Sequence, residues 1–201
     1  MRSNYKSAFY LGAMALFLTC IEGLIGKYVV TSHLEGGVVT IHLLIALIII
    51  SLLIMSYSFI NKGNMEIKSN YTPDQINVIN WIFTFMIIAI ILGTQVRENI
   101  EDLIPLSIMG PFKYLHSLLG IGTLMLTGVL WNKITSNNNK VNTKNYIKIL
   151  LNIFIIQVAL GYFMVFGGLP PYAKLLHMWL ASIGVGIIVH ILMDVKLSKI
   201  S

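Results

Sequence analysis

The chain has 201 residues, of which 56% are hydrophobic and 11% charged, and its formal net charge is +6. Soluble domains carry about 25% charged residues, so this composition excludes an ordinary soluble protein and indicates an integral membrane protein. The positive residues lie in the loops, at the two ends of the chain and near the ends of the apolar segments, which is typical of a membrane orientation signal, and we expect no nucleic-acid partner.

Six apolar segments follow one another, and each has the roughly 20 residues that a helix needs to cross a bilayer. They predict an all-α, polytopic membrane helix bundle. The polar stretches 61–75 and 132–146 have the size of linkers, so we expect a single integral membrane domain over residues 1–201. The predicted helices are approximately residues 8–31, 37–60, 76–96, 112–131, 147–167 and 173–195.

The first predicted helix contains Glu22 and the only cysteine of the chain, Cys20. One cysteine excludes an intrachain disulfide, a CxxC site and the CxxCH attachment of a c-type heme. A carboxyl group inside an apolar helix is costly, so it is usually functional or hydrogen-bonded in a packed interface. Glu22 is therefore a candidate catalytic residue that orients a ligand or handles protons, and a protonated structural acid is the alternative.

Three histidines recur near the start of the second, fourth and sixth predicted helices: His42, His116 and His177. A glycine precedes each of these histidines in the helix before it. Gly26 and Gly161 lie 16 residues before His42 and His177, and Gly93 lies 23 residues before His116. Glu22 and Gln157 each lie four residues before their glycine, which favours a shared structural role. The pattern predicts repeated helical hairpins with small residues between close helices.

Repeated histidines at one depth of a membrane need a common cause. A neutral imidazole can coordinate heme iron, and two imidazoles on facing helices supply both axial ligands of a b-type heme. The alternative is a set of histidines that each bond a backbone carbonyl or lie in an interface. His33, in the first outer loop, and His190, near the inner end of the last helix, do not share the repeat, so we expect structural or solvated roles for them.

Arg97 follows the third predicted helix at its outer end. Its planar guanidinium suits a heme propionate, because it can bind a carboxylate through two hydrogen bonds. The alternative is a surface arginine that extends toward the lipid headgroups. The acidic residues that follow it predict a solvated loop face: Glu98, Glu101 and Asp102.

Lysine and arginine are unequally distributed between the two sides of the predicted bundle. Ten lie on the side of the two termini and four on the other side. Cytoplasmic loops retain positive charge, so we predict cytoplasmic termini and histidines near the outer face. The membrane lipid is then a partner, and a bacterial or archaeal plasma membrane is the expected location.

Four segments resemble the heme A synthase family of cytochrome oxidase assembly proteins, and the resemblance extends over most of the chain. The most specific pieces are the LGTQVRE run and the LG, LP and LHxxLA elements of the last hairpin. The four segments are GKYVVTSHLEGGVVTIHLLIAL (26–47), ILGTQVRENIEDL (91–103), YLHSLLG (114–120) and VALGYFMVFGGLPPYAKLLHMWLA (158–181).

The resemblance implies a membrane oxidoreductase that converts a ring methyl of heme O to the formyl group of heme A, with water as the oxygen source. By motif, His116 and His177 correspond to the two histidines that bind the iron of the cofactor, heme b. His42 corresponds to the second histidine on the iron of the substrate, heme O. Heme O synthase and cytochrome oxidase subunits are partners that this role implies.

The resemblance begins at the third of the eight helices that are usual in the family, so a Glu-x-x-His motif of the first helix pair has no equivalent here. We therefore expect a second chain that supplies the missing helices, an incomplete gene model, a homodimer in which two His42 residues share one heme, or a paralogue without synthase activity. Two alternatives to the enzyme follow. One is a non-catalytic b-type heme-binding or electron-transfer subunit, and the other is a cofactor-free membrane assembly protein.

Overall fold

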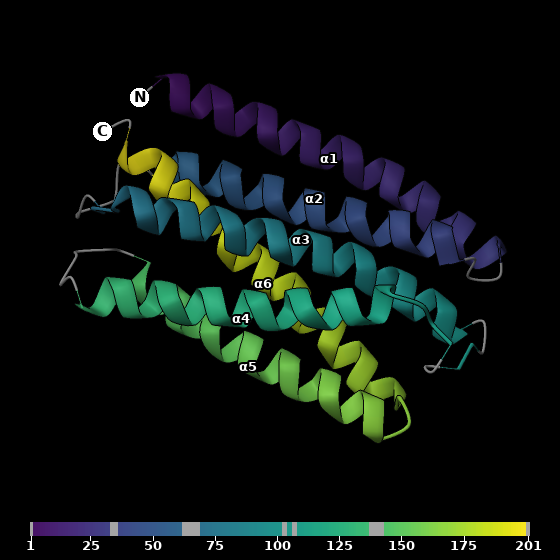
Figure 1. Cartoon of the computed structure of the whole chain (residues 1–201). Helices are drawn as coiled ribbons and strands as arrows, with labels where there is room; N and C mark the ends of the chain where they lie inside the picture. The colour runs from purple at the N-terminus through teal and green to yellow at the C-terminus, as the bar shows by residue number, and fades with distance from the viewer. Residues whose placement is uncertain are drawn as a thin grey trace. The chain divides into compact units, whose positions relative to one another are not determined.

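The computed structural model describes residues 2–32, 36–61, 69–101, 104–105, 108–136 and 143–199. These residues form six α-helices and no strand, and every helix is long and apolar enough to cross a membrane. The predicted all-helical fold is confirmed, and it suggests an integral membrane protein (Figure 1). The helices are α1 (Arg2–Thr31), α2 (Gly36–Asn61), α3 (Pro73–Glu101), α4 (Phe112–Ser136), α5 (Lys144–Phe166) and α6 (Pro171–Ser198).

Most helices extend beyond the apolar segments that predict them. The clearest difference is in α3, which continues through Glu101 and so takes in Arg97 and Glu98, two residues expected in the following loop. Glutamine, arginine and glutamate are good helix formers, so the helix does not end where the apolar run ends. The predictions for His33 and Asp102 lie outside the described residues.

The start of α3 is defined by its own side chains. The Thr72 backbone N–H donates to the Gln75 side-chain oxygen over 2.9 Å, and the Gln75 backbone N–H donates to the Thr72 hydroxyl over 3.3 Å. This reciprocal pair is a capping box, and Pro73 occupies the first helical position, where its missing N–H has no consequence.

The chain divides into two compact units, Met1–Glu66 and Ile67–Ser201. The first unit is a hairpin in which α1 packs against α2. The hydroxyl of Ser56 on α2 donates to the carbonyl of Ala8 on α1 over 2.9 Å, which ties the two helices together at that end. The expectation of one membrane domain stays a prediction.

The second unit is a four-helix bundle (Figure 1). Helices that follow one another in the chain pack as neighbours, and α3 also packs against α6, which closes the bundle. The four helices therefore form a closed ring in the order α3, α4, α5 and α6, in which α4 and α6 lie diagonally opposite each other. Side chains from these two helices can therefore meet in the interior.

Packing in the second unit is uneven along its length. The last three turns of α5 (155–166) and the first three turns of α4 (112–122) contain no buried residue. In contrast, the tightly packed half lies where α3 and α5 begin and α4 and α6 end. The large side chains that are fully buried in this half are Ile79, Ile82, Leu130, Ile134, Ile147, Leu150, Ile188, Ile191 and Leu197.

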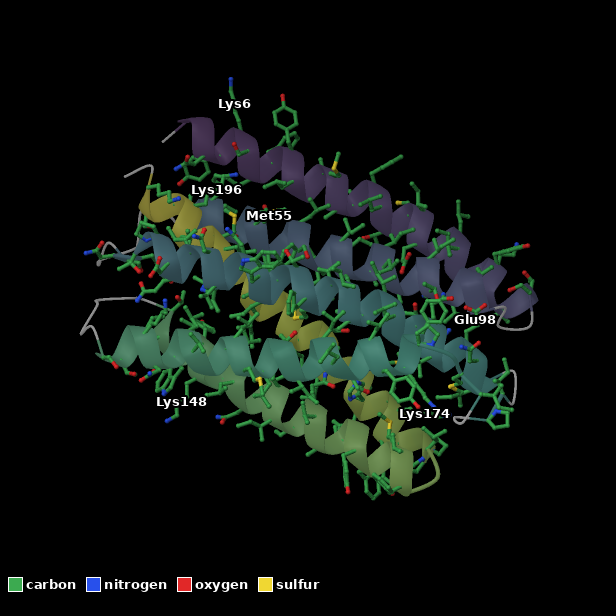
Figure 2. The ribbon with its side chains drawn as sticks, in the orientation of Figure 1. Lys6, Met55, Glu98, Lys148, Lys174 and Lys196 are labelled. Atoms are coloured by element: carbon green, nitrogen blue, oxygen red, sulfur yellow. The ribbon has the colours of Figure 1, made fainter. Side chains whose placement is uncertain are left out.

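The tightly packed half also carries most of the lysines of the second unit, and we call it the lysine-rich end. Figure 2 shows Lys148 and Lys196 at this end and Glu98 and Lys174 at the opposite end. Positive charge concentrated at one end of a bundle is the pattern that cytoplasmic loops show. The lysines of this end are Lys133, Lys144, Lys148, Lys196 and Lys199.

A buried carboxyl group joins three segments at the lysine-rich end. Asp194 on α6 is 2% exposed, and its Oδ2 atom accepts hydrogen bonds from the hydroxyls of Ser69, over 2.7 Å, and Tyr71, over 2.8 Å. The Tyr71 hydroxyl also contacts that of Thr143, just before α5. Burial, together with the Asp194 carboxylate, raises the pKa of the Tyr71 hydroxyl. The phenol therefore stays protonated and donates.

Candidate functional site

The structure brings together two of the three repeated histidines. His116 on α4 and His177 on α6 have ring centroids 6.2 Å apart, with an interplanar angle of 62°. The two helices are diagonal neighbours in the bundle, so the rings meet in its interior. They lie in the loosely packed half, away from the lysine-rich end.

The separation of the two rings can be compared with that of two axial ligands. An imidazole nitrogen binds a metal at about 2.0–2.1 Å, and the ring centroid lies about 1.1 Å behind that nitrogen. Two rings on opposite sides of one iron therefore have centroids about 6 Å apart. The spacing of His116 and His177 fits this value.

The ring of His116 is held by the neighbouring helix α3. Its Nδ1 atom lies 2.8 Å from the carbonyl oxygen of Ala89. A carbonyl only accepts, so Nδ1 carries the hydrogen and Nε2 keeps the lone pair that a metal needs. Gly93 makes room for the ring, because a Cβ there would lie 2.9 Å from Cε1 of His116. The sequence expectation of a close approach at this glycine is confirmed.

His177 is held by its backbone and not by its ring. The side-chain amide of Gln157 on α5 donates to the His177 carbonyl over 2.8 Å. Nδ1 of His177 is buried and makes no hydrogen bond with the described residues. The expectation of close packing at Gly161 is wrong, because a Cβ there would meet nothing within 4 Å.

His42 belongs to the first unit, where it lies against two residues of α1. Its Nδ1 atom is 3.0 Å from Oε1 of Glu22, which is the distance of an ion pair, although the contact lacks the alignment of a hydrogen bond. A Cβ at Gly26 would lie 3.3 Å from Cε1 of His42. His42 therefore packs over Gly26 as His116 packs over Gly93, and the close approach expected at Gly26 is confirmed.

Arg97 lies one helical turn beyond Gly93 on α3, so it shares the helix face that contacts His116. The Nε and Nη2 atoms of its guanidinium are buried. Glu98 lies on the neighbouring position, and its side chain receives a hydrogen bond from exposed Gln95 over 3.4 Å. Arg97 therefore lies in the same half of the bundle as His116, with part of its guanidinium buried.

The donor set of His116 and His177 fits heme. No group of three or more histidine, cysteine, aspartate or glutamate side chains in the described part of the chain could hold an ion. In heme the porphyrin supplies four of the ligands, so a pair of imidazoles is sufficient. His190 is different, because its ring packs 4.8 Å from that of Tyr146, which agrees with the structural role expected for it.

The sequence analysis missed two functional groups, the Ala89 carbonyl and the Asp194 carboxyl group. The Ala89 carbonyl is a backbone group that no residue pattern reveals. Asp194 could have been found, because it is a carboxyl group inside an apolar segment, and such groups need a partner. Its hydroxyl partners come from segments far apart in the chain.

The six apolar helices suggest an integral membrane protein, in which two of the repeated histidines come together between the helices of the second unit. A family model described as cytochrome oxidase assembly protein, COX15-CtaA, matches residues 1–111. The chain belongs to this family, which confirms the predicted heme A synthase family, and it has a role in cytochrome oxidase assembly. The matched region contains His42 and Arg97 and ends before His116. No curated protein and no solved structure matches the chain.

Proposed function

We propose that the protein oxidises heme O to heme A and uses a resident b-type heme held by His116 and His177. The observation that carries this proposal is the separation of the two imidazoles, 6.2 Å between ring centroids, which suits two ligands of one iron. Family membership supports the reaction, because the family is that of the heme A synthases.

The surroundings of the two histidines support the same proposal. The helix segments around them contain few buried side chains, whereas the lysine-rich end is closely packed. A bundle that closes at one end and leaves the other loosely packed suits a large flat ligand between its helices. Arg97 would bind a propionate of this ligand through its planar fork.

The residues of the chain have separate tasks in this proposal. The Ala89 carbonyl fixes the tautomer of His116, so that Nε2 keeps the lone pair that would bind the iron. His116 and His177 would hold a b-type heme, which would supply electron-transfer chemistry for the oxidation. His42 would bind the iron of heme O, whose methyl carbon loses electrons and protons and receives an oxygen atom from water.

The proposed partners follow from the same chemistry. Lipid surrounds the apolar helices, and heme O synthase and cytochrome oxidase subunits supply and receive the hemes. Among the described residues of the first unit, His42 is the only histidine. We propose that a second ligand for the substrate heme comes from another chain or from a second copy of this one.

The test is to express the full chain together with a heme O source, purify it in detergent and extract its hemes. We expect new heme A in the wild-type sample and none in His42→Ala, which should keep its b-type heme. Bound heme without any conversion would instead support an electron-transfer subunit. The absence of any heme would support an assembly protein without a cofactor.

A further inference from the structure

The carboxyl group of Glu22 lies next to Nδ1 of His42. Its side chain is 14% exposed, against 38% for His42, and its Oε1 atom is 3.0 Å from Nδ1 of the imidazole. Neither carboxyl oxygen accepts a hydrogen bond from the described residues. A carboxyl group buried in an apolar helix needs a polar partner, and the imidazole is the partner that the structure provides.

The ring of His42 is fixed from two sides by one face of α1. Glu22 and Gly26 are four residues apart, so they lie one turn apart on the same face. Glu22 faces Nδ1, and Gly26 lies below Cε1, where a Cβ would be 3.3 Å away. With Nδ1 lying 3.0 Å from a carboxyl oxygen, Nε2 is the nitrogen that remains for a metal.

The hairpin of α3 and α4 places a different acceptor next to Nδ1 of its histidine. Ala89 lies four residues before Gly93, as Glu22 lies four residues before Gly26, and its carbonyl oxygen contacts Nδ1 of His116 over 2.8 Å. Both rings therefore lie over a glycine, with Nδ1 close to an oxygen atom one turn back along the neighbouring helix. One acceptor is a neutral backbone carbonyl and the other is a carboxyl group.

From this contrast we propose that Glu22 is a positioning residue that selects Nε2 of His42 as the iron ligand for heme O and strengthens its bond to the iron. A carboxylate behind a ligating histidine orients the ring and raises its basicity more than a carbonyl does. The inference rests on the proposed function only in assigning heme O to His42.

The experiment measures the affinity of the purified full chain for ferric heme O by absorbance titration. Replacing an acceptor behind a ligating histidine typically costs 10–100-fold in affinity. We expect a loss of about 10-fold in Glu22→Gln and a larger loss in Glu22→Leu, which has no acceptor at all. Thr19→Val is the matched control. Thr19 lies on the same helix, and its hydroxyl donates to the carbonyl oxygen of Ala15 within that helix.

Two further measurements separate positioning from general damage. In a His42→Ala background, Glu22→Gln should cause no additional loss, because the residue acts through the imidazole. In ferrous samples of the wild type, the iron–histidine stretching frequency should fall when Glu22 is replaced by Gln. An unchanged affinity in Glu22→Gln, or an equal loss with and without His42, would overturn the inference.

Failure of this inference differs from failure of the proposed function. A wild-type chain that converts heme O while Glu22→Gln binds it equally well would overturn the role of Glu22 and keep the enzyme. A chain that never converts heme O but loses affinity for it in Glu22→Gln would overturn the enzyme and support the positioning role.

Discussion

A glycine lies beneath the imidazole ring in two of the three hairpins, and this contact sets what each position tolerates. At Gly93 an added Cβ would be 2.9 Å from Cε1 and 3.1 Å from Nδ1 of His116, which is closer than atoms can pack without movement. The ring would have to leave its hydrogen bond with the Ala89 carbonyl. Gly161, at the aligned position of the third hairpin, has open space instead.

We therefore expect Gly93→Ala to lower the amount of b-type heme per protein at least several-fold, whereas Gly161→Ala should leave it near the wild-type value. Both substitutions add the same methyl group to a helical glycine, so helix propensity changes equally. The heme content can be measured from reduced-minus-oxidised difference spectra. An equal heme content in the two variants would show that the space above Gly93 does not position the ring of His116.

Asp194 illustrates a polar residue whose role is stability. Its replacement by Ala removes the acceptor of the Ser69 and Tyr71 hydroxyls, and unsatisfied buried groups cost about 1–3 kcal/mol each. We expect a clear fall in the thermal midpoint of the detergent-solubilised protein, with an unchanged heme spectrum, because the cluster lies at the lysine-rich end.

Asp74→Ala is the matched control for that measurement. Its carboxylate is 77% exposed and lies 3.4 Å from the Lys133 ammonium, and exposed ion pairs contribute about 0–1 kcal/mol. The thermal midpoint should barely move. If Asp74→Ala lowers it as much as Asp194→Ala, the buried cluster is not the stabilising element that its geometry indicates.

The helices were the most predictable part of this protein, because length and apolarity alone decide whether a segment can cross a membrane. Their ends were less predictable. The chain continues in a helix through Arg97 and Glu98, since polar helix formers extend α3 beyond its apolar run. The pairing of His116 with His177 was predicted, but the acceptor for His116 is a backbone carbonyl and leaves no mark in the sequence.

The turn between α5 and α6 shows a further limit of sequence reasoning. Gly168 and Leu169 both have positive φ, at 76° and 60°, and Pro170 precedes the first turn of α6. Glycine adopts this conformation freely, whereas leucine rarely does. Leucine at such a position gives no signal in advance, because its conformation is imposed by the helices on either side.

The distribution of lysines makes a prediction about the direction in which the helices cross the membrane. The lysine-rich end should be cytoplasmic, and the C-terminus follows Lys199 at that end. A C-terminal green fluorescent protein fusion should therefore fluoresce, and a C-terminal alkaline phosphatase fusion should be inactive. An active phosphatase with a dark fluorescent fusion would reverse the orientation.

The two units of the chain each carry part of the proposed chemistry. The first unit offers one histidine backed by a carboxyl group, and the second offers a pair of histidines in a loosely packed bundle half. The family match includes all of the first unit and stops before the histidine pair of the second. The heme-binding role that we propose for that pair therefore rests on the geometry of the bundle.

The most direct test of the account is the reduced-minus-oxidised absorption spectrum of the purified wild type and of three alanine variants. We predict a low-spin b-type heme signal in the wild type, its loss in His116→Ala and in His177→Ala, and its retention in His42→Ala. Equal loss in all three variants, or an unchanged signal in His116→Ala, would contradict the assignment of His116 and His177 as the two ligands of one heme.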